Sequence, residues 1–185
     1  NNPTANLWNA DTIRRLITQV SAYGGLVVMD EAYQPFSSKS WLDEIRQHPA
    51  ANANVLLMRT LSKFGLAGIR LGYMIAPQAL INEVDKLRPP YNVSVLNAEC
   101  ALFALEHTDV FAQQAAVIRT EREALFKALQ QMTGVTPYAS EANMMVLRFN
   151  GEADAANRAF EVLKAHKVLV KNVSKMHPLL ANCLR

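Results

Sequence analysis

Apolar residues recur at helical spacing in some parts of residues 1–90 and form continuous runs in others. Asp11 is followed by apolar residues at helical spacing up to Gly24 and Gly25, which predicts a capped amphipathic helix. Continuous apolar runs such as Leu26–Met29 are typical of strands covered on both faces. The predicted elements are helices at 11–23, 41–48 and 77–87 and strands at 26–29, 54–58 and 71–76. Their alternation predicts an α/β fold with a mainly parallel sheet that has helices on both faces.

The pattern changes after the extended break at Arg88-Pro89-Pro90-Tyr91. Ser94 caps a predicted helix to about His107, and a longer helix follows from Asp109 to about Met132. The last part predicts a compact β-β-α-β pattern, with strands at 135–140, 144–149 and 168–171 and a helix at 153–166. We therefore predict part of a large α/β domain at 1–92, connecting helices at 93–132, and a small α+β C-terminal domain at 133–185.

The composition is that of a globular protein. Half of the 185 residues are apolar, which is enough to bury a core. The net charge of +3 is mild and the basic residues are scattered, so we expect no nucleic-acid partner. No run of about 18 apolar residues predicts a membrane span. Cys100, Cys183 and the four histidines lack metal-ligand spacing, so we predict no metal site, two free thiols and a cytoplasmic location.

Polar side chains gather just after two consecutive predicted strands. Pyridoxal phosphate chemistry needs an amine for a Schiff base, a carboxylate facing the pyridinium nitrogen, a phenol near O3′, and a cation with hydroxyls for the phosphate. The residues that offer these groups are Asp30 and Tyr33 after the first strand, and Thr60, Ser62, Lys63 and Arg70 after the second. The sequence thus contains one of each group that the cofactor requires.

Each of these residues taken alone has a simpler explanation. Lys63 fits a solvated surface position, Asp30 fits a turn cap, and Tyr33 fits an amphipathic packing position. Their joint placement after two strands favours a shared site over these separate explanations, because an open α/β sheet binds its ligands at the carboxyl ends of the strands. We therefore predict a pyridoxal phosphate site at this edge of the sheet.

These segments resemble the fold type I pyridoxal-phosphate-dependent aminotransferases. The resemblance covers essentially all of the chain, and the lysine segment is its most specific mark. The matching segments are Asn-Asn-Pro-Thr at 1–4, Val-Met-Asp-Glu-Ala-Tyr at 28–33, the run from Arg59 to Tyr73, and Asn-Cys-Leu-Arg at 182–185. The family's N-terminal part and its last strand and helix have no counterpart here, so the chain looks like an internal fragment.

The resemblance implies a role for each matching residue. It implies that Lys63 binds the cofactor covalently and moves the substrate proton, that Asp30 pairs with the pyridine nitrogen, and that Tyr33 is the third catalytic residue. Asn2 and Tyr33 would hold O3′. The remaining implied contacts are Thr60, Ser62 and Arg70 for the cofactor phosphate, and Arg185, Lys171 and Asn143 for the substrate.

The implied activity is amino transfer between histidinol phosphate and 2-oxoglutarate in histidine biosynthesis, because the resemblance is strongest to family members with that activity. The partners would be a small-molecule amino donor and a 2-oxo acid, and the full-length protein would be a homodimer. Transamination of aromatic amino acids and decarboxylation of an amino-acid phosphate are the nearest alternatives. A cofactor-binding sensor half of a transcription regulator, and an inert fragment, stay open as alternatives of other classes.

Overall fold

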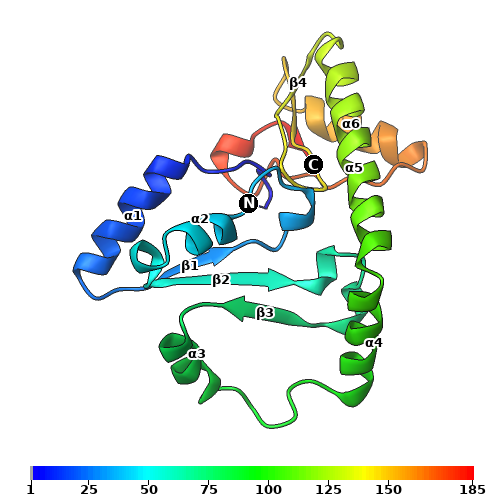
Figure 1. The fold of residues 1–185 in the computed structure, drawn as a ribbon. Coiled ribbons are helices and arrows are strands. Elements are labelled where there is room, and N and C mark those ends of the chain that lie inside the picture. Colours follow the sequence, from blue (N-terminus) through cyan, green and yellow to red (C-terminus); the bar gives the residue numbers. More distant parts are fainter. Residues whose placement is uncertain (1) are drawn as a thin grey trace. The chain divides into compact units, whose positions relative to one another are not determined.

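The computed structural model describes residues 2–185, which divide into two compact units. One unit is Trp8–Ala115, and the other combines the N-terminal segment up to Leu7 with Ala116–Arg185. Each unit has its own three-stranded sheet. Figure 1 labels the three strands of the Trp8–Ala115 unit as β1, β2 and β3. The boundaries predicted at 92/93 and 132/133 concern the domains of a larger protein and stay a prediction.

The sheet of the Trp8–Ala115 unit has the order β1-β2-β3. Its strands are β1 (Val27–Asp30), β2 (Val55–Thr60) and β3 (Gly72–Ile75). β1 and β2 are parallel, with Asp30 opposite Met58, whereas β3 runs antiparallel to β2 with Gly72 opposite Thr60. The three predicted strands and the α/β class are confirmed. The direction of β3 brings its first residue next to the last residue of β2, which places the loop between them at the predicted site.

Helices cover both faces of this sheet, as predicted. The helices of this unit are α1 (Ala10–Ala22), α2 (Trp41–Gln47), α3 (Gln78–Asp85) and α4 (Val95–Glu106). α1 and α2 pack on one face through a buried core of Ile17, Trp41, Val55 and Leu57. α3 lies beside Met58 on the other face, since neighbouring residues of a strand point to opposite faces.

One predicted helix cap was wrong. We expected Asp11 to cap the first helix, but the N-cap is Asn9, whose Oδ1 accepts the amides of Asp11 and Thr12 at 2.9 and 3.1 Å. Asp11 lies inside the first turn, where its charge complements the helix dipole. The Ser94 cap is confirmed, because its side chain accepts the amide of Asn97 at 3.1 Å.

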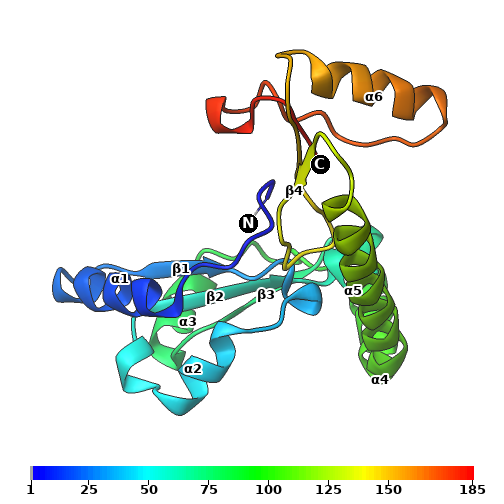
Figure 2. The same cartoon turned by 90° about the horizontal axis from the view of Figure 1, so that it is seen from above.

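α5 (Thr108–Gln130) begins in one unit and continues in the other. The second unit then has an antiparallel sheet of order β4-β5-β6 and the helix α6 (Ala155–Ala165). Figure 2 labels β4 and α6. The strands are β4 (Val135–Pro137), β5 (Leu147–Phe149) and β6 (Cys183–Leu184). Its core contains Val146, Val173 and Cys183.

The strand predicted at 168–171 was wrong. Leu169 is 83% exposed, so the apolar run there does not reflect burial in a sheet. Asn172 makes an isolated bridge with Leu184, and the third strand is β6 instead. A strand of two residues is too short to produce a readable pattern.

Short 3-10 turns complete the described fold, and they lie at Gln34–Phe36, Ala50–Asn52, Leu61–Lys63, Ala67–Ile69 and Pro178–Leu180. Within residues 2–185 the structure has no helix with the length and apolar character needed to span a membrane.

Candidate functional site

The turn after β1 presents Asp30 and Tyr33. The Asp30 carboxylate accepts the amide of Ala32 at 2.8 Å, and the amide of Glu31 donates to Met58 O at 2.8 Å. The turn is therefore fixed to β2 by a backbone bond while the Asp30 carboxylate stays at the exposed edge. Tyr33 follows as the residue that precedes the Gln34–Phe36 turn.

The turn after β2 is organised by Thr60. The Thr60 hydroxyl accepts the amide of Ser62 at 3.0 Å and donates to Leu71 O at 3.2 Å. Arg70 has a left-handed backbone, with φ of 56°, and its Nη1 donates to Ser62 Oγ at 3.4 Å. The structure thus brings together Ser62 and Arg70, a hydroxyl and a guanidinium that are eight positions apart in the sequence.

Lys63 and Tyr33 connect the two turns. The Lys63 Nζ lies 5.5 Å from the centre of the Tyr33 ring, which is within the range of a cation–π contact. The predicted amine and phenol are therefore neighbours, although thirty positions separate them.

An aromatic contact packs against the turn that contains Lys63. Phe64 packs against Phe111 of α5, with ring centres 5.0 Å apart. Gly65 has φ of 102°, and a Cβ at this position would lie 3.1 Å from Phe111 Cδ1. No local sequence pattern predicts this contact, because Phe111 lies in a separate helix.

A part-buried polar network joins the two strand ends, and we did not predict it from the sequence. Glu31 Oε2 accepts Arg59 Nε at 3.1 Å, Arg59 Nη2 at 2.9 Å and Ser40 Oγ at 3.0 Å. Glu31 Oε1 accepts the amide of Trp41. Burial alone lowers the pKa of Arg59, but hydrogen bonds with Tyr73 and Glu31 outweigh it and raise the pKa of this guanidinium. The sequence does carry a signal for this network, because the acidic Glu31 follows Asp30 and the basic Arg59 precedes Thr60.

The other unit holds a second group of predicted residues. Lys171 and Arg185 exchange backbone hydrogen bonds, from Lys171 N to Arg185 O at 2.9 Å and from Arg185 N to Lys171 O at 2.8 Å. The Arg185 Nη1 donates to Asn2 Oδ1. The structure therefore brings together the predicted O3′ ligand and two predicted substrate ligands.

Asn143 lies exposed in the loop between β4 and β5. Ser140 Oγ accepts the amide of Ala142 at 3.1 Å and donates to Met144 O, which fixes the loop on both sides of Asn143. Ala5 O accepts the amide of Glu141 at 2.7 Å, so this loop contacts the segment that carries Asn2. The substrate role of Asn143 stays a prediction.

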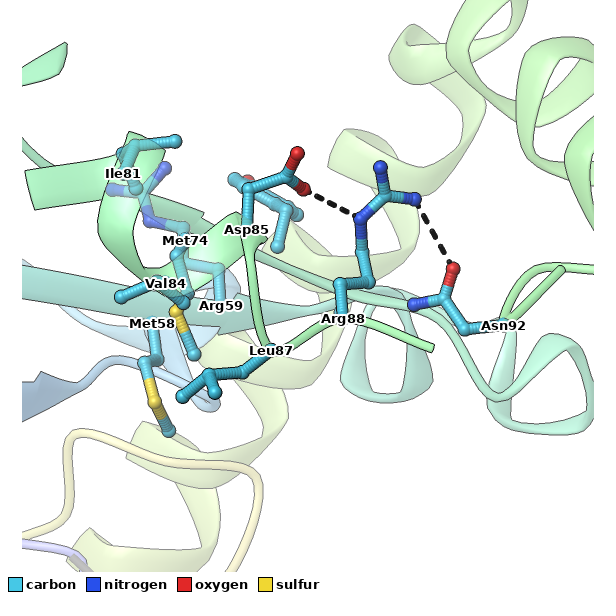
Figure 3. A pocket seen from close by; sticks show the side chains of 11 residues that line it. Met58, Arg59, Met74, Ile81, Val84, Asp85, Leu87, Arg88 and Asn92 are labelled. Carbon is cyan, nitrogen blue, oxygen red and sulfur yellow. Dashed lines mark hydrogen bonds and ion pairs between the residues drawn. The ribbon is translucent and has the colours of Figure 1, made fainter. Parts of the chain in front are cut away.

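Asp30, Tyr33 and Lys63 line neither of two sizeable cavities in the Trp8–Ala115 unit. The first, of about 540 Å³, is mostly apolar; Figure 3 shows Arg88 at its rim between Asp85 and Asn92. It is lined by Met58, Arg59, Gly72, Tyr73, Met74, Ile81, Val84, Asp85, Leu87, Arg88 and Asn92. The second, of about 650 Å³, has Glu31, Arg59 and Thr60 in its lining. Thr60 thus lines the second cavity, whereas Asp30, Tyr33 and Lys63 line neither of the two.

Comparison with known proteins gives the family. The model of the family "Aminotransferase class I and II" matches residues 1–185, and the chain belongs to this family. The histidinol-phosphate aminotransferase of Methylibium petroleiphilum is 62% identical over 185 residues, which are all of this chain and 48% of that protein. That of Acidovorax sp. (strain JS42) is 62% identical over 186 residues and is covered to 50%. The chain thus spans about half the length of the curated relatives it matches.

Solved structures confirm the fold type I aminotransferase fold. The histidinol-phosphate aminotransferase from Clostridium acetobutylicum matches with a TM-score of 0.85 and 18% identity, covering 100% of this chain and 55% of that one. The same enzyme from Sinorhizobium meliloti, in complex with pyridoxal-5′-phosphate, matches with a TM-score of 0.76 and 25% identity, covering 100% of this chain and 49% of that one.

The described side chains fit pyridoxal phosphate by their chemistry and placement. Lys63 offers an amine beside the Tyr33 phenol, and Ser62 with Arg70 offers a donor pair suited to a phosphate. The Asp30 carboxylate lies at the carboxyl end of β1, next to the strand that leads to Lys63. Among residues 2–185 no group of three or more His, Cys, Asp or Glu side chains is arranged to hold a metal ion.

Proposed function

We propose that this chain is part of a pyridoxal-phosphate-dependent aminotransferase that moves an amino group between histidinol phosphate and 2-oxoglutarate. The observation that carries the proposal is the approach of Lys63 to Tyr33 at the ends of two adjacent strands. The 62% identity with curated histidinol-phosphate aminotransferases supports the choice of substrate.

When bound, pyridoxal phosphate supplies a ring that accepts electrons released at the substrate Cα. Asp30 would hold a proton on the ring nitrogen, because a nearby carboxylate favours the charged form of that nitrogen. Tyr33 and Asn2 would donate hydrogen bonds to O3′. Ser62 and Arg70 would hold the phosphate, with Thr60 keeping the turn in shape.

Lys63 has two successive tasks in this proposal. Its amine would hold the cofactor and, once the substrate amine has replaced it there, the freed Lys63 amine would accept the proton from the substrate Cα. The Tyr33 ring beside Nζ limits where that amine can lie, which favours proton transfer at one atom.

Lys171 and Arg185 would bind the substrate anion. They project from directly opposed positions, and Arg185 adds the planar donor geometry that suits phosphate and carboxylate. Asn143 would add an amide contact from its loop. A phosphate with two negative charges gains more from two adjacent cations than a single carboxylate does.

We further propose that the full-length protein is a cytoplasmic homodimer whose partners are its small-molecule amino donor and 2-oxo acid. α4 supports a larger assembly, because Val95 and Leu96 are 76% exposed and Phe103 is 63% exposed. Large apolar side chains that are exposed together on one helix are normally covered by further protein. Sedimentation equilibrium of the full-length protein measures the subunit number.

Borohydride reduction of the full-length protein with pyridoxal phosphate, followed by peptide mapping, tests the site. We expect the pyridoxyl group on Lys63. Lys63→Arg should lose both the label and amino transfer, whereas Lys39→Arg, at an exposed loop position, should retain both. Recovery of the label on another lysine of the unaltered protein would contradict the proposal.

A further inference from the structure

Glu31, Ser40 and Arg59 form a closed network that we name the strand-end clamp. The Glu31 and Arg59 side chains are only 14% and 15% exposed, and their closest atoms are 2.9 Å apart. Ser40 Oγ donates to Glu31 at 3.0 Å and accepts from Arg59 Nη2 at 2.7 Å, so all three side chains are bonded to one another. Ion pairs this well satisfied and this little exposed fix geometry far better than surface pairs do.

The clamp lies one position away from two residues of the proposed site. Asp30 precedes Glu31, and Thr60 follows Arg59. Arg59 and Thr60 are successive residues of β2, so their side chains point to opposite faces. Glu31 directly follows Asp30, the last residue of β1, and its amide donates to Met58 O of β2 at 2.8 Å. Fixing Glu31 to Arg59 therefore fixes Asp30 relative to the Thr60 turn.

The distance between Asp30 and the turn after Thr60 is important because the proposed cofactor is a rigid ring. The ring nitrogen and the phosphate of pyridoxal phosphate lie at a set distance, and their proposed partners are Asp30 on one strand end and the Ser62 turn on the other. We propose that the strand-end clamp is a positioning device that sets the separation between these two partners. This inference rests on the proposed function, and it assigns Glu31, Ser40 and Arg59 no contact with substrate.

The test compares Glu31→Gln with Glu44→Gln in the full-length protein. Glu44 is a matched control, because it also binds an arginine through two bonds, from Arg14 Nε at 3.1 Å and Nη2 at 2.6 Å, in the same unit. Two quantities are measured on the cofactor-free protein: the Kd for pyridoxal phosphate by absorbance titration, and amide hydrogen exchange of peptides covering residues 30–34 and 60–64.

We expect Glu31→Gln to raise this Kd at least about tenfold and to speed exchange in both turns together, because it leaves Arg59 without its charged partner. Glu44→Gln should change neither quantity. A Kd within about twofold of the unaltered protein overturns the inference. So does a raised Kd with unchanged exchange, since the effect would then not pass through the turns.

Milder variants keep the test decisive if Glu31→Gln does not fold. Ser40→Ala removes one hydroxyl, and Arg59→Lys keeps the charge but loses the forked geometry. Both should raise the Kd by about threefold or more, and unchanged Kd values in both overturn the inference. Failure of the unaltered protein to bind pyridoxal phosphate would instead refute the proposed function, while faster exchange in both turns would still support the clamp.

Discussion

Lys171 and Arg185 lie directly opposite each other across two antiparallel segments, each amide bonded to the other's carbonyl at 2.9 and 2.8 Å. Directly opposed residues project to the same face, and like charges in such a pair repel. An anion bound at both side chains removes that repulsion. The pair therefore favours a ligand with a strongly charged group, and this is what the proposed substrate offers.

The first prediction concerns this pair. The full-length protein should have a higher kcat/KM for histidinol phosphate than for phenylalanine, and Lys171→Ala should lower the value for histidinol phosphate by about tenfold or more. Lys175→Ala, at an exposed position nearby in the chain, serves as the control and should have little effect. Equal values for the two donors, or a preference for phenylalanine, would favour an aromatic aminotransferase.

Asp30→Asn should leave folding and cofactor binding largely intact and lower amino transfer by several orders of magnitude. The substitution keeps the shape of the side chain but removes the charge that keeps the ring nitrogen protonated. Single-turnover kinetics report the chemical step directly. Asp43→Asn, on the exposed side of α2, should keep the normal rate. A near-normal rate for Asp30→Asn would mean that Asp30 does not face the ring nitrogen.

Gly65→Ala should destabilise the protein by about 1–3 kcal/mol, because it places a side chain at positive φ. The new Cβ would also lie 3.1 Å from a ring atom of Phe111. Gly68→Ala is the matched control, since a Cβ there meets nothing within 4 Å. Urea unfolding of the two variants measures the difference. Equal urea midpoints for the two variants would show that the turn containing Lys63 accepts the added methyl group without loss of stability.

The Arg14–Glu44 pair should contribute stability that depends on pH. The hydrogen bond from Arg14 lowers the pKa of Glu44, so the contribution is fully present above the ordinary glutamate pKa of 4.5. It is lost as the pH falls through the lowered pKa. Glu44→Gln should therefore reduce stability near pH 7, and the difference should shrink as the pH drops below about 4.5. Denaturant unfolding at several pH values measures it.

Glu161→Gln is the control for this prediction, because Glu161 comes no closer than 3.9 Å to Lys164. Its substitution should change stability little at any pH. A stability difference between Glu44→Gln and the unaltered protein that stays the same below pH 4.5 would contradict the lowered pKa of Glu44.

The 185-residue chain by itself should bind pyridoxal phosphate weakly and self-associate. It carries exposed apolar side chains on α4, such as Leu96 and Phe103, and such surfaces favour association. Titration of the cofactor into this chain and into the full-length protein, together with light scattering, compares the two. Equal affinity and turnover would mean that the site is more self-contained than we propose.

The sequence by itself determined the local features of this protein. The apolar runs gave the three strands of the Trp8–Ala115 unit, and Ser94 marked the start of α4, because these signals depend only on neighbouring residues. The segment around Lys63 marked the family, which the match over residues 1–185 confirms. The candidate site residues were chosen at this level, and their catalytic roles stay predictions.

The tertiary structure decided what depends on segments distant in the chain. The direction of β3, the two-residue strand β6 and the clamp between Glu31 and Arg59 each arise from pairing across 12 or more positions, which no local pattern encodes. The contact of Phe111 with the turn that follows Lys63 is of the same kind. A sequence pattern reports whether a residue is buried or capped, whereas the partner it meets is set by how the whole chain packs.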